Sequence, residues 1–168
     1  EFTITDTAEI QKVEMKDDVP IGRIIINKKG EFLSEVSWND MVAGAMDSIW
    51  GYVTGSLKDV TFEIYAREDI KAADGESDDY YKKDELVATI KTDELGIART
   101  DDLPLGKYYV VEKETADGFV LDGEPRDIDL TYRDQDTPVV TFDSEWQNSR
   151  QKAKVIVTKK EKDSDRVL

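Results

Sequence analysis

Short runs in which apolar and polar residues alternate recur along this chain, and they constrain its fold more than any other feature. The runs are rich in Val, Ile, Tyr and Phe and span 22–28, 60–65, 86–90, 107–113, 126–132, 139–142 and 154–159. A period of two is typical of strands with one buried face. Turn signals such as Asp117-Gly118 separate the runs too closely for helical crossovers. The pattern therefore predicts an all-β fold, an antiparallel sandwich or barrel.

The segment 37–50 departs from this alternation. Its apolar residues recur at helical spacing, Ser37 and Asp40 resemble a capping box, and Gly51 follows as a stop signal. The sequence therefore predicts one inserted amphipathic helix. Its apolar stripe includes Trp38, Met41, Met46 and Trp50. Such a stripe more often covers an open edge of a sandwich; the alternative is a binding surface for a partner helix or a lipid surface.

Charge and composition exclude several classes of function. The chain has 38 acidic and 23 basic residues, a net charge of −15 that repels phosphate backbones and anionic lipids. No apolar run approaches the roughly 20 residues that span a bilayer. The chain has no Cys and no His, so the commonest nucleophile, general base and transition-metal ligands are missing. We expect no nucleic-acid partner, no membrane insertion, no metal, no cofactor and no enzymatic turnover.

The chain also overlaps with itself. Residues 22–28 (GRIIINK) align without gaps on residues 153–159 (AKVIVTK), and the same offset places Asp17 on Asn148. Over so few residues the match can be coincidence, but it has the form of two seams in a tandem array. On this interpretation, residues 1–21 are a linker or the last strand of a preceding repeat. Residues 22–152 form one unit with an insert at 30–57, and residues 153–168 open the following repeat.

A series of motifs carries a resemblance to a known family. In order they are GRIIINK (22–28), LKDVTFEIY (57–65), KTDELGIARTDDLPLGKYYVVEKETADGF (91–119) and EWQNSRQK (145–152). The order resembles the SpaA-type, or collagen-adhesin B-type, domain of Gram-positive surface adhesins and pilins. The stretch 103–119 is similar to the family signature LPxGxYxVxExxAPxGY, with Ala116 in place of Pro and Phe119 in place of Tyr. The resemblance implies an immunoglobulin-like (prealbumin-like) β-sandwich.

The resemblance also implies an intramolecular isopeptide bond between a Lys of the first strand and an Asn of the last, assisted by a Glu. Lys28, Asn148 and Glu112 fall on these positions. Chemistry supports such a trio, because burial favours a neutral, nucleophilic lysine and a protonated carboxyl that can polarise the amide. Alternation places each of the three on an apolar face of its strand, whereas Lys29 points to the opposite face and is a control.

Asp17 and Lys159 fall on the acceptor and nucleophile positions of neighbouring repeats, and we expect both to stay unreacted in this chain. The function implied is a structural stalk repeat of an extracellular adhesin or pilin, anchored to the cell wall through the full-length protein. Its partners would be neighbouring repeats of the same polypeptide. The alternative is a ligand-binding adhesin module that uses the Trp-rich insert 37–57 to contact a host protein.

Overall fold

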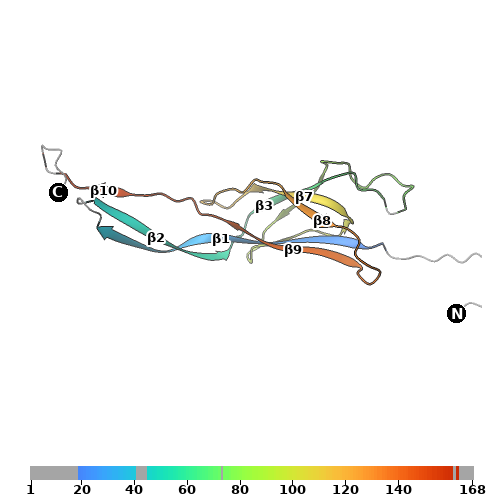
Figure 1. The fold of residues 1–168 in the computed structure, drawn as a ribbon, viewed down its shortest axis with the longest axis horizontal. Helices are drawn as coiled ribbons and strands as arrows, with labels where there is room; N and C mark the ends of the chain where they lie inside the picture. Colours follow the sequence, from blue (N-terminus) through green and yellow to red (C-terminus); the bar gives the residue numbers. More distant parts are fainter. Residues whose placement is uncertain (1–18, 41–44, 73, 161, 163–168) are drawn as a thin grey trace, which may run out of the picture.

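The computed structural model describes residues 19–40, 45–72, 74–160 and 162, apart from the side chains of 38–40 and 45–49. These residues form two sheets and, in the part described, no helix (Figure 1). The larger sheet contains β1 (Ile21–Asp40), β2 (Ala45–Ser56), β5 (Ile97–Arg99), β6 (Leu103–Pro104), β9 (Val139–Asn148) and β10 (Ile156–Thr158). The smaller sheet has the order β4 (Leu86–Lys91), β3 (Thr61–Ala66), β7 (Gly106–Glu114), β8 (Arg126–Leu130). The predicted β-sandwich is confirmed.

The core lies between the two sheets and follows the alternation of the sequence. In β3 the residues Phe62, Ile64 and Ala66 are buried, while the residues between them are half-buried. Other strands of the same sheet add Tyr108, Val110, Ile128 and Leu130, and the larger sheet contributes Ile24, Ile26, Val140 and Trp146. Each such side chain contributes roughly 1.5–3 kcal/mol on leaving water, so this face determines the register of every strand.

The first and last long strands of the sandwich are parallel neighbours. β1 pairs with β9 from Ile21 opposite Val139 to Gly30 opposite Asn148, and the other strand pairs are antiparallel. A parallel pair needs a long connection between its strands. Here the connection is nearly the whole domain, because every strand from β2 to β8 lies between β1 and β9 in the sequence.

The predicted helix over 37–50 is wrong. Residues 37–40 end β1 and residues 45–50 begin β2, and the two strands pair antiparallel with Ser37 opposite Ile49 and Val36 opposite Trp50. Residues 41–44 lie outside the described part. The sequence fits a strand as well as a helix, since Val, Ile and Trp favour strands and Gly44 costs a helix about 1 kcal/mol. Pairing with a neighbouring strand decides between the two.

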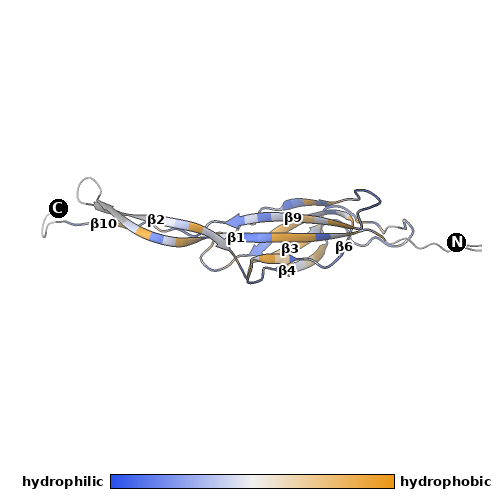
Figure 2. Ribbon diagram, turned by 90° about the horizontal axis from the view of Figure 1, so that it is seen from below, coloured by the Kyte–Doolittle hydropathy of each residue, from blue (hydrophilic) through white to orange (hydrophobic). Residues whose placement is uncertain are grey.

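The two paired strands extend beyond the sandwich as a long hairpin. Figure 1 and Figure 2 both show β1 and β2 reaching past the second sheet, with β10 beside β2 near their far end. The strong orange colour in Figure 2 gathers where the two sheets face each other. Residues 19–21, where β1 begins, lie at the opposite end of the long axis. No helix in the described part is long and apolar enough to cross a membrane.

Gly96 lies in a turn that touches the backbone of Lys28. It has a φ of +75°, its carbonyl accepts a hydrogen bond from the Lys28 amide at 2.7 Å, and an added Cβ would lie 2.5 Å from the Lys28 carbonyl oxygen. We expect Gly96→Ala to lower the free energy of unfolding by about 2–3 kcal/mol, from backbone strain plus this clash.

The matched control is Gly75→Ala. Gly75 has a similar φ of +70°, but an added Cβ would meet nothing within 4 Å. This substitution should lower the free energy of unfolding by about 1 kcal/mol, from backbone strain alone. Urea unfolding of both variants checks the prediction, and equal losses would contradict it.

Candidate functional site

Three charged or amide side chains are buried between the sheets. Lys28 of β1, Glu112 of β7 and Asn148 of β9 are each at most 3% exposed. The alternation of their strands places them there, next to Ile26, Val110 and Trp146 on the same faces. Buried polar groups are costly unless they are hydrogen-bonded, so their contacts with one another decide whether this arrangement is stable.

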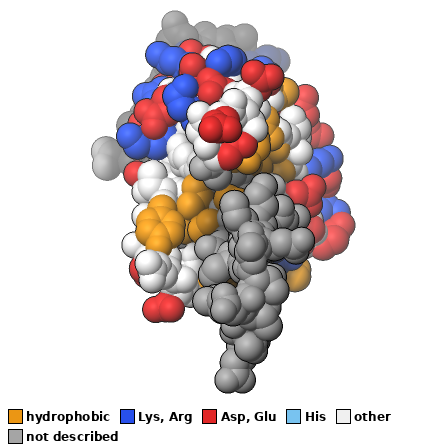
Figure 3. All heavy atoms as spheres, turned by 90° about the vertical axis from the view of Figure 1, so that its right-hand side faces the viewer, with side chains coloured by type: hydrophobic (Ala, Val, Ile, Leu, Met, Phe, Trp, Pro, Cys, Tyr) orange, Lys and Arg blue, Asp and Glu red, His pale blue; other side chains and the backbone are white. Residues whose placement is uncertain are grey.

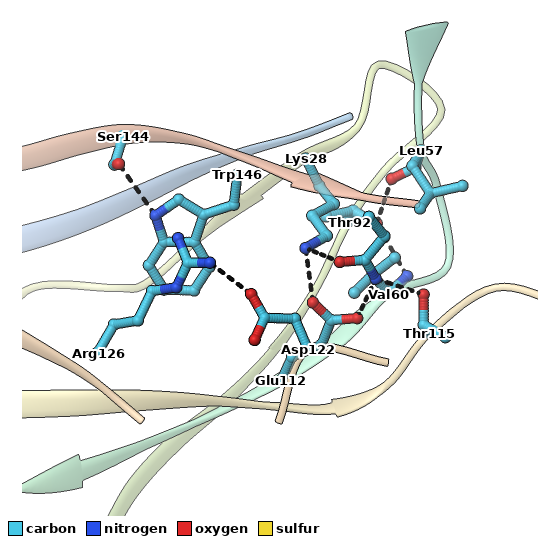
Figure 4. A network of polar contacts seen from close by, with 11 residues as sticks. Lys28, Leu57, Val60, Thr92, Glu112, Thr115, Asp122, Arg126, Ser144 and Trp146 are labelled. Atoms are coloured by element: carbon cyan, nitrogen blue, oxygen red, sulfur yellow. Dashed lines mark hydrogen bonds and ion pairs between the residues drawn. The ribbon is translucent and has the colours of Figure 1, made fainter. Parts of the chain in front are cut away.

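The three side chains contact one another directly (Figure 4). Lys28 Nζ donates to Glu112 Oε2 at 2.6 Å and to Asn148 Oδ1 at 2.7 Å. Asn148 Nδ2 donates to Glu112 Oε1 and, at 2.8 Å, to Thr115 Oγ1. The carboxylate of Glu112 therefore bridges the lysine nitrogen and the amide nitrogen, with one oxygen on each.

Aromatic side chains and an ion pair enclose this cluster. Lys28 Nζ lies 5.7 Å from the centre of the Phe62 ring, and Phe62 packs edge-on against Trp146. The Arg126 guanidinium lies 4.5 Å from the centre of the Trp146 ring and pairs with Asp122 (Figure 4). These groups keep water from the lysine and the amide.

The surroundings of Lys28 act on its pKa in opposite directions. Burial lowers the pKa and is the largest effect, and Arg126 adds to it. The hydrogen bond and charge of Glu112 and the charge of Asp122 raise it. The net direction is downward from 10.5, which favours the neutral, nucleophilic amine.

The other buried polar side chain in the described part has a structural role. Thr92 Oγ1 donates to the Leu57 carbonyl and accepts from the Val60 amide, both at 2.9 Å. Lys29, next to Lys28, is half-buried on the other face of β1. Among the residues that the structure describes, only the trio of Lys28, Glu112 and Asn148 joins an amine, a carboxylate and an amide in one enclosed space.

The remaining residues singled out in the sequence lie elsewhere. Lys159 is exposed just after β10, and Asp17 lies outside the described part. Trp38 belongs to β1, Met46 and Trp50 belong to β2, and Met41 is not described. The single helical stripe expected here does not form, because Trp38 lies in β1 whereas Met46 and Trp50 lie in β2. A binding role for the insert stays a prediction.

Sequence reasoning missed the groups around the trio. Thr115 follows the end of β7, where alternation no longer tells which side a residue faces. Asp122 and Arg126 belong to a loop and to the start of β8, and no spacing rule connects them to Trp146. Phe62 was identified as part of a strand, but its contact with the lysine depends on how the two sheets pack.

A separate apolar hollow lies at the N-terminal end of the sandwich. It encloses about 480 Å³ between residues 19–21, residues 103–105, Tyr80 and Tyr132. Figure 3, which looks at this end, shows hydrophobic side chains gathered near the centre and charged side chains around them. None of the residues that line the hollow belongs to the Lys28 cluster.

Fold and site together define a prealbumin-type sandwich with a buried Lys–Glu–Asn cluster. The family model of the SpaA prealbumin-like fold domain matches residues 52–146, more than half of the chain. The chain belongs to this family. No curated protein matches it.

Several solved structures of Gram-positive surface proteins are similar. The minor pilin GBS52 of Streptococcus agalactiae is 20% identical over 79% of this chain and 46% of its own, with a TM-score of 0.46. The major pilin SpaD of Corynebacterium diphtheriae is 21% identical over 83% of this chain and 32% of its own, at 0.47. The major pilin SpaA of the same organism is 18% identical over 77% and 31%, at 0.46. This chain spans less than half the length of each.

Proposed function

We propose that this chain is a stalk unit of a Gram-positive surface adhesin or pilin and that it crosslinks itself between Lys28 and Asn148. The observation that carries the proposal is the position of Glu112, whose two carboxylate oxygens bind the attacking nitrogen and the leaving nitrogen at once. A carboxylate in that position can take a proton from the first nitrogen and deliver it to the second. Family membership supports the same function.

The reaction balances with the groups present. Lys28 gives one proton to Glu112 and becomes a neutral amine, whose lone pair attacks Cγ of Asn148 while the carbonyl electrons move to Oδ1. Glu112 then protonates Nδ2, the C–N bond to Nδ2 breaks, and ammonia leaves. The electrons on Oδ1 form the carbonyl double bond again, and the attacking nitrogen releases a second proton to the carboxylate. The product is an amide between the two side chains.

Folding supplies the proximity that drives this reaction. Lys28 and Asn148 are 120 residues apart in the sequence, and Lys28 Nζ lies 2.7 Å from Asn148 Oδ1 in the structure. Holding reactants in contact can replace roughly 7–11 kcal/mol of the barrier. The reaction occurs once per chain, so the product is a crosslinked domain and there is no enzymatic turnover. We place that domain outside the cell, attached to the wall through the rest of its protein.

Intact mass of the denatured chain tests the proposal. We expect the native chain to be lighter than its composition by one ammonia and Glu112→Ala to have its full mass, because the proton carrier is gone. Lys29→Ala is the matched control and should lose ammonia like the native chain. Full mass for the native chain would refute the crosslink.

The same measurement tests the proposed boundaries of the repeat. With residues 1–21 and 153–168 belonging to neighbouring units, Asp17 and Lys159 have no reaction partners in this chain. We therefore expect the loss of a single ammonia and no loss of water. A peptide crosslinked at Asp17 or Lys159 would show that the boundaries are wrong.

In a variant that cannot form the bond, the burial of Lys28 should make the free energy of unfolding depend on pH. In Asn148→Ala the folded lysine keeps a pKa below 10.5, so between that lowered value and 10.5 the unfolded chain binds more protons. The free energy of unfolding should therefore rise as the pH is raised toward about 10. Urea midpoints of Asn148→Ala and of Asn148→Ala/Lys28→Met give the comparison, and parallel pH profiles would contradict the prediction.

A further inference from the structure

The hairpin of β1 and β2 has an outer edge, on β2, where a further strand can pair. Beyond Gly30, β1 pairs only with β2 in the described part, from Lys29 opposite Ser56 outward. A two-stranded hairpin without a third strand is marginally stable in water. The outer edge of β2 would also present unpaired backbone groups that attract other chains. In the structure β10 occupies this edge at residues 45–47 of β2.

The segment that leaves the sandwich is fastened along this hairpin, first at its base. After Asn148 the chain pairs with the loop at 118–120: Val120 N donates to the Ser149 carbonyl and Gln151 N to the Gly118 carbonyl, both at 2.8 Å. The Arg150 guanidinium lies 5.3 Å from the centre of the Phe119 ring. Phe119 in turn packs edge-on against Phe32 of β1.

Further along, side chains of the hairpin hold the leaving segment. Glu31 Oε2 accepts from the Arg150 amide at 3.1 Å and pairs with Lys152 Nζ at 2.9 Å. The same ammonium lies 4.4 Å from the centre of the Tyr52 ring of β2. β10 then pairs antiparallel with β2, from Ile156 opposite Asp47 to Thr158 opposite Ala45. The leaving segment therefore follows the hairpin from its base to its far end (Figure 1).

We propose that the outer edge of β2 is a docking site for one extended strand and that the hairpin is a splint for the chain leaving the domain. Backbone pairing would provide the affinity, as in other cases of strand addition, and Glu31 and Tyr52 would select a basic residue before the strand. The splint holds the leaving chain along the long axis of the sandwich.

The sequence indicates which kind of strand this edge accepts. Residues 156–158 align with residues 25–27, which in this unit pair antiparallel with β5. β10 therefore pairs with β2 in the same antiparallel sense in which the matching residues of β1 pair with β5. The occupant is therefore a segment with the sequence pattern of residues 22–28, docked here on one edge, whereas residues 25–27 of this unit are paired on both edges, with β5 and with β9. That the occupant belongs to a following repeat rests on the proposed stalk function, whereas the docking of β10 does not.

Distance measurements between two spin labels test the splint. The chain has no Cys, so Thr141→Cys on β9 and Lys162→Cys beyond β10 would carry the only labels. We expect a single narrow distance distribution for the native chain. A broad distribution would overturn the proposal.

Two proline variants make the test specific. Consecutive amides of a strand point to opposite sides, so only one of Ile156 and Val157 directs its N–H toward β2. Proline is tolerated on an edge strand where the N–H faces solvent. We expect one of Ile156→Pro and Val157→Pro to broaden the distribution severalfold and the other to leave it narrow. A narrow distribution in both would refute docking through the backbone.

Exchanging the docked segment tests its identity. Replacing residues 153–159 by the sequence of 22–28 should keep the distribution narrow, while a Gly-Ser segment of the same length should broaden it. Broadening by the 22–28 sequence would refute the assignment to this sequence pattern. Intact mass separates this inference from the proposed function, because these changes lie outside the Lys28 cluster and should leave the loss of ammonia intact. Lys28→Ala should in turn keep the narrow distribution.

Discussion

Under a pulling force that leaves the native chain at its folded length, a chain with Lys28→Ala is expected to extend by about 400 Å. With the bond in place, tension that enters before β1 reaches Lys28, crosses to Asn148 and leaves toward β10. The chain between the two partners, which are 120 positions apart, carries no load. Without the bond the whole intervening chain is in the path of the force, and at roughly 3.4 Å per residue it accounts for that length.

Single-molecule pulling on chains held at both ends measures this difference. The matched control is Lys29→Ala, which removes a lysine from the other face of β1 and should not extend. The geometry of β1 and β9 also predicts that the unbonded domain resists before it yields, since parallel neighbours pulled at opposite ends load all their ladder hydrogen bonds together. Extension of the native chain by the same length would contradict the load-bearing role.

Glu112→Ala should lower the free energy of unfolding through two separate contributions. It prevents the crosslink, whose loop of 120 residues contributes about 4–5 kcal/mol by the entropy of loop closure. It also leaves the Lys28 ammonium, at 1% exposure, without its carboxylate partner, and breaking a buried pair in this way costs about 3–5 kcal/mol.

Urea unfolding of a small set of variants separates these two contributions. Lys28→Met also prevents the crosslink, but it leaves the Glu112 carboxylate in the core without its ammonium partner, so it should lose both contributions as well. The double variant Lys28→Met/Glu112→Leu should be more stable than Glu112→Ala, because no charge is left in the core. If Glu112→Ala unfolded at the same urea concentration as this double variant, the unpaired lysine would contribute nothing to the loss of stability.

The alternation of the sequence predicted most of the sandwich and the placement of the trio. Ile24, Ile26 and Lys28 share one face of β1, and Lys28 is buried because that face belongs to the core. The same argument placed Glu112 beside Val110 and Asn148 beside Trp146. Period-two patterns are reliable here because one buried face determines every side chain on a strand.

Other features depend on contacts that a local pattern does not contain. The sequence predicts a helix where the hairpin lies, because the residues fit the helical period as well as the strand period. Only pairing with the partner strand decides between the two. β5 and β6 have three and two residues, too few for a period to be recognised. Thr115, which accepts a hydrogen bond from Asn148, follows the end of β7. Beyond a strand, alternation no longer predicts which side a side chain faces.

The parallel pairing of β1 and β9 has a consequence for how the protein is made. Lys28 is among the first residues of the domain to be synthesised, and Asn148 is the last residue of β9, the strand that pairs beside it. The two cannot meet until everything between them has been translated and β9 has settled beside β1. Until then the chain carries no covalent loop between these two residues. The proposed crosslink would close only afterwards, and so would mark the molecules that have finished folding.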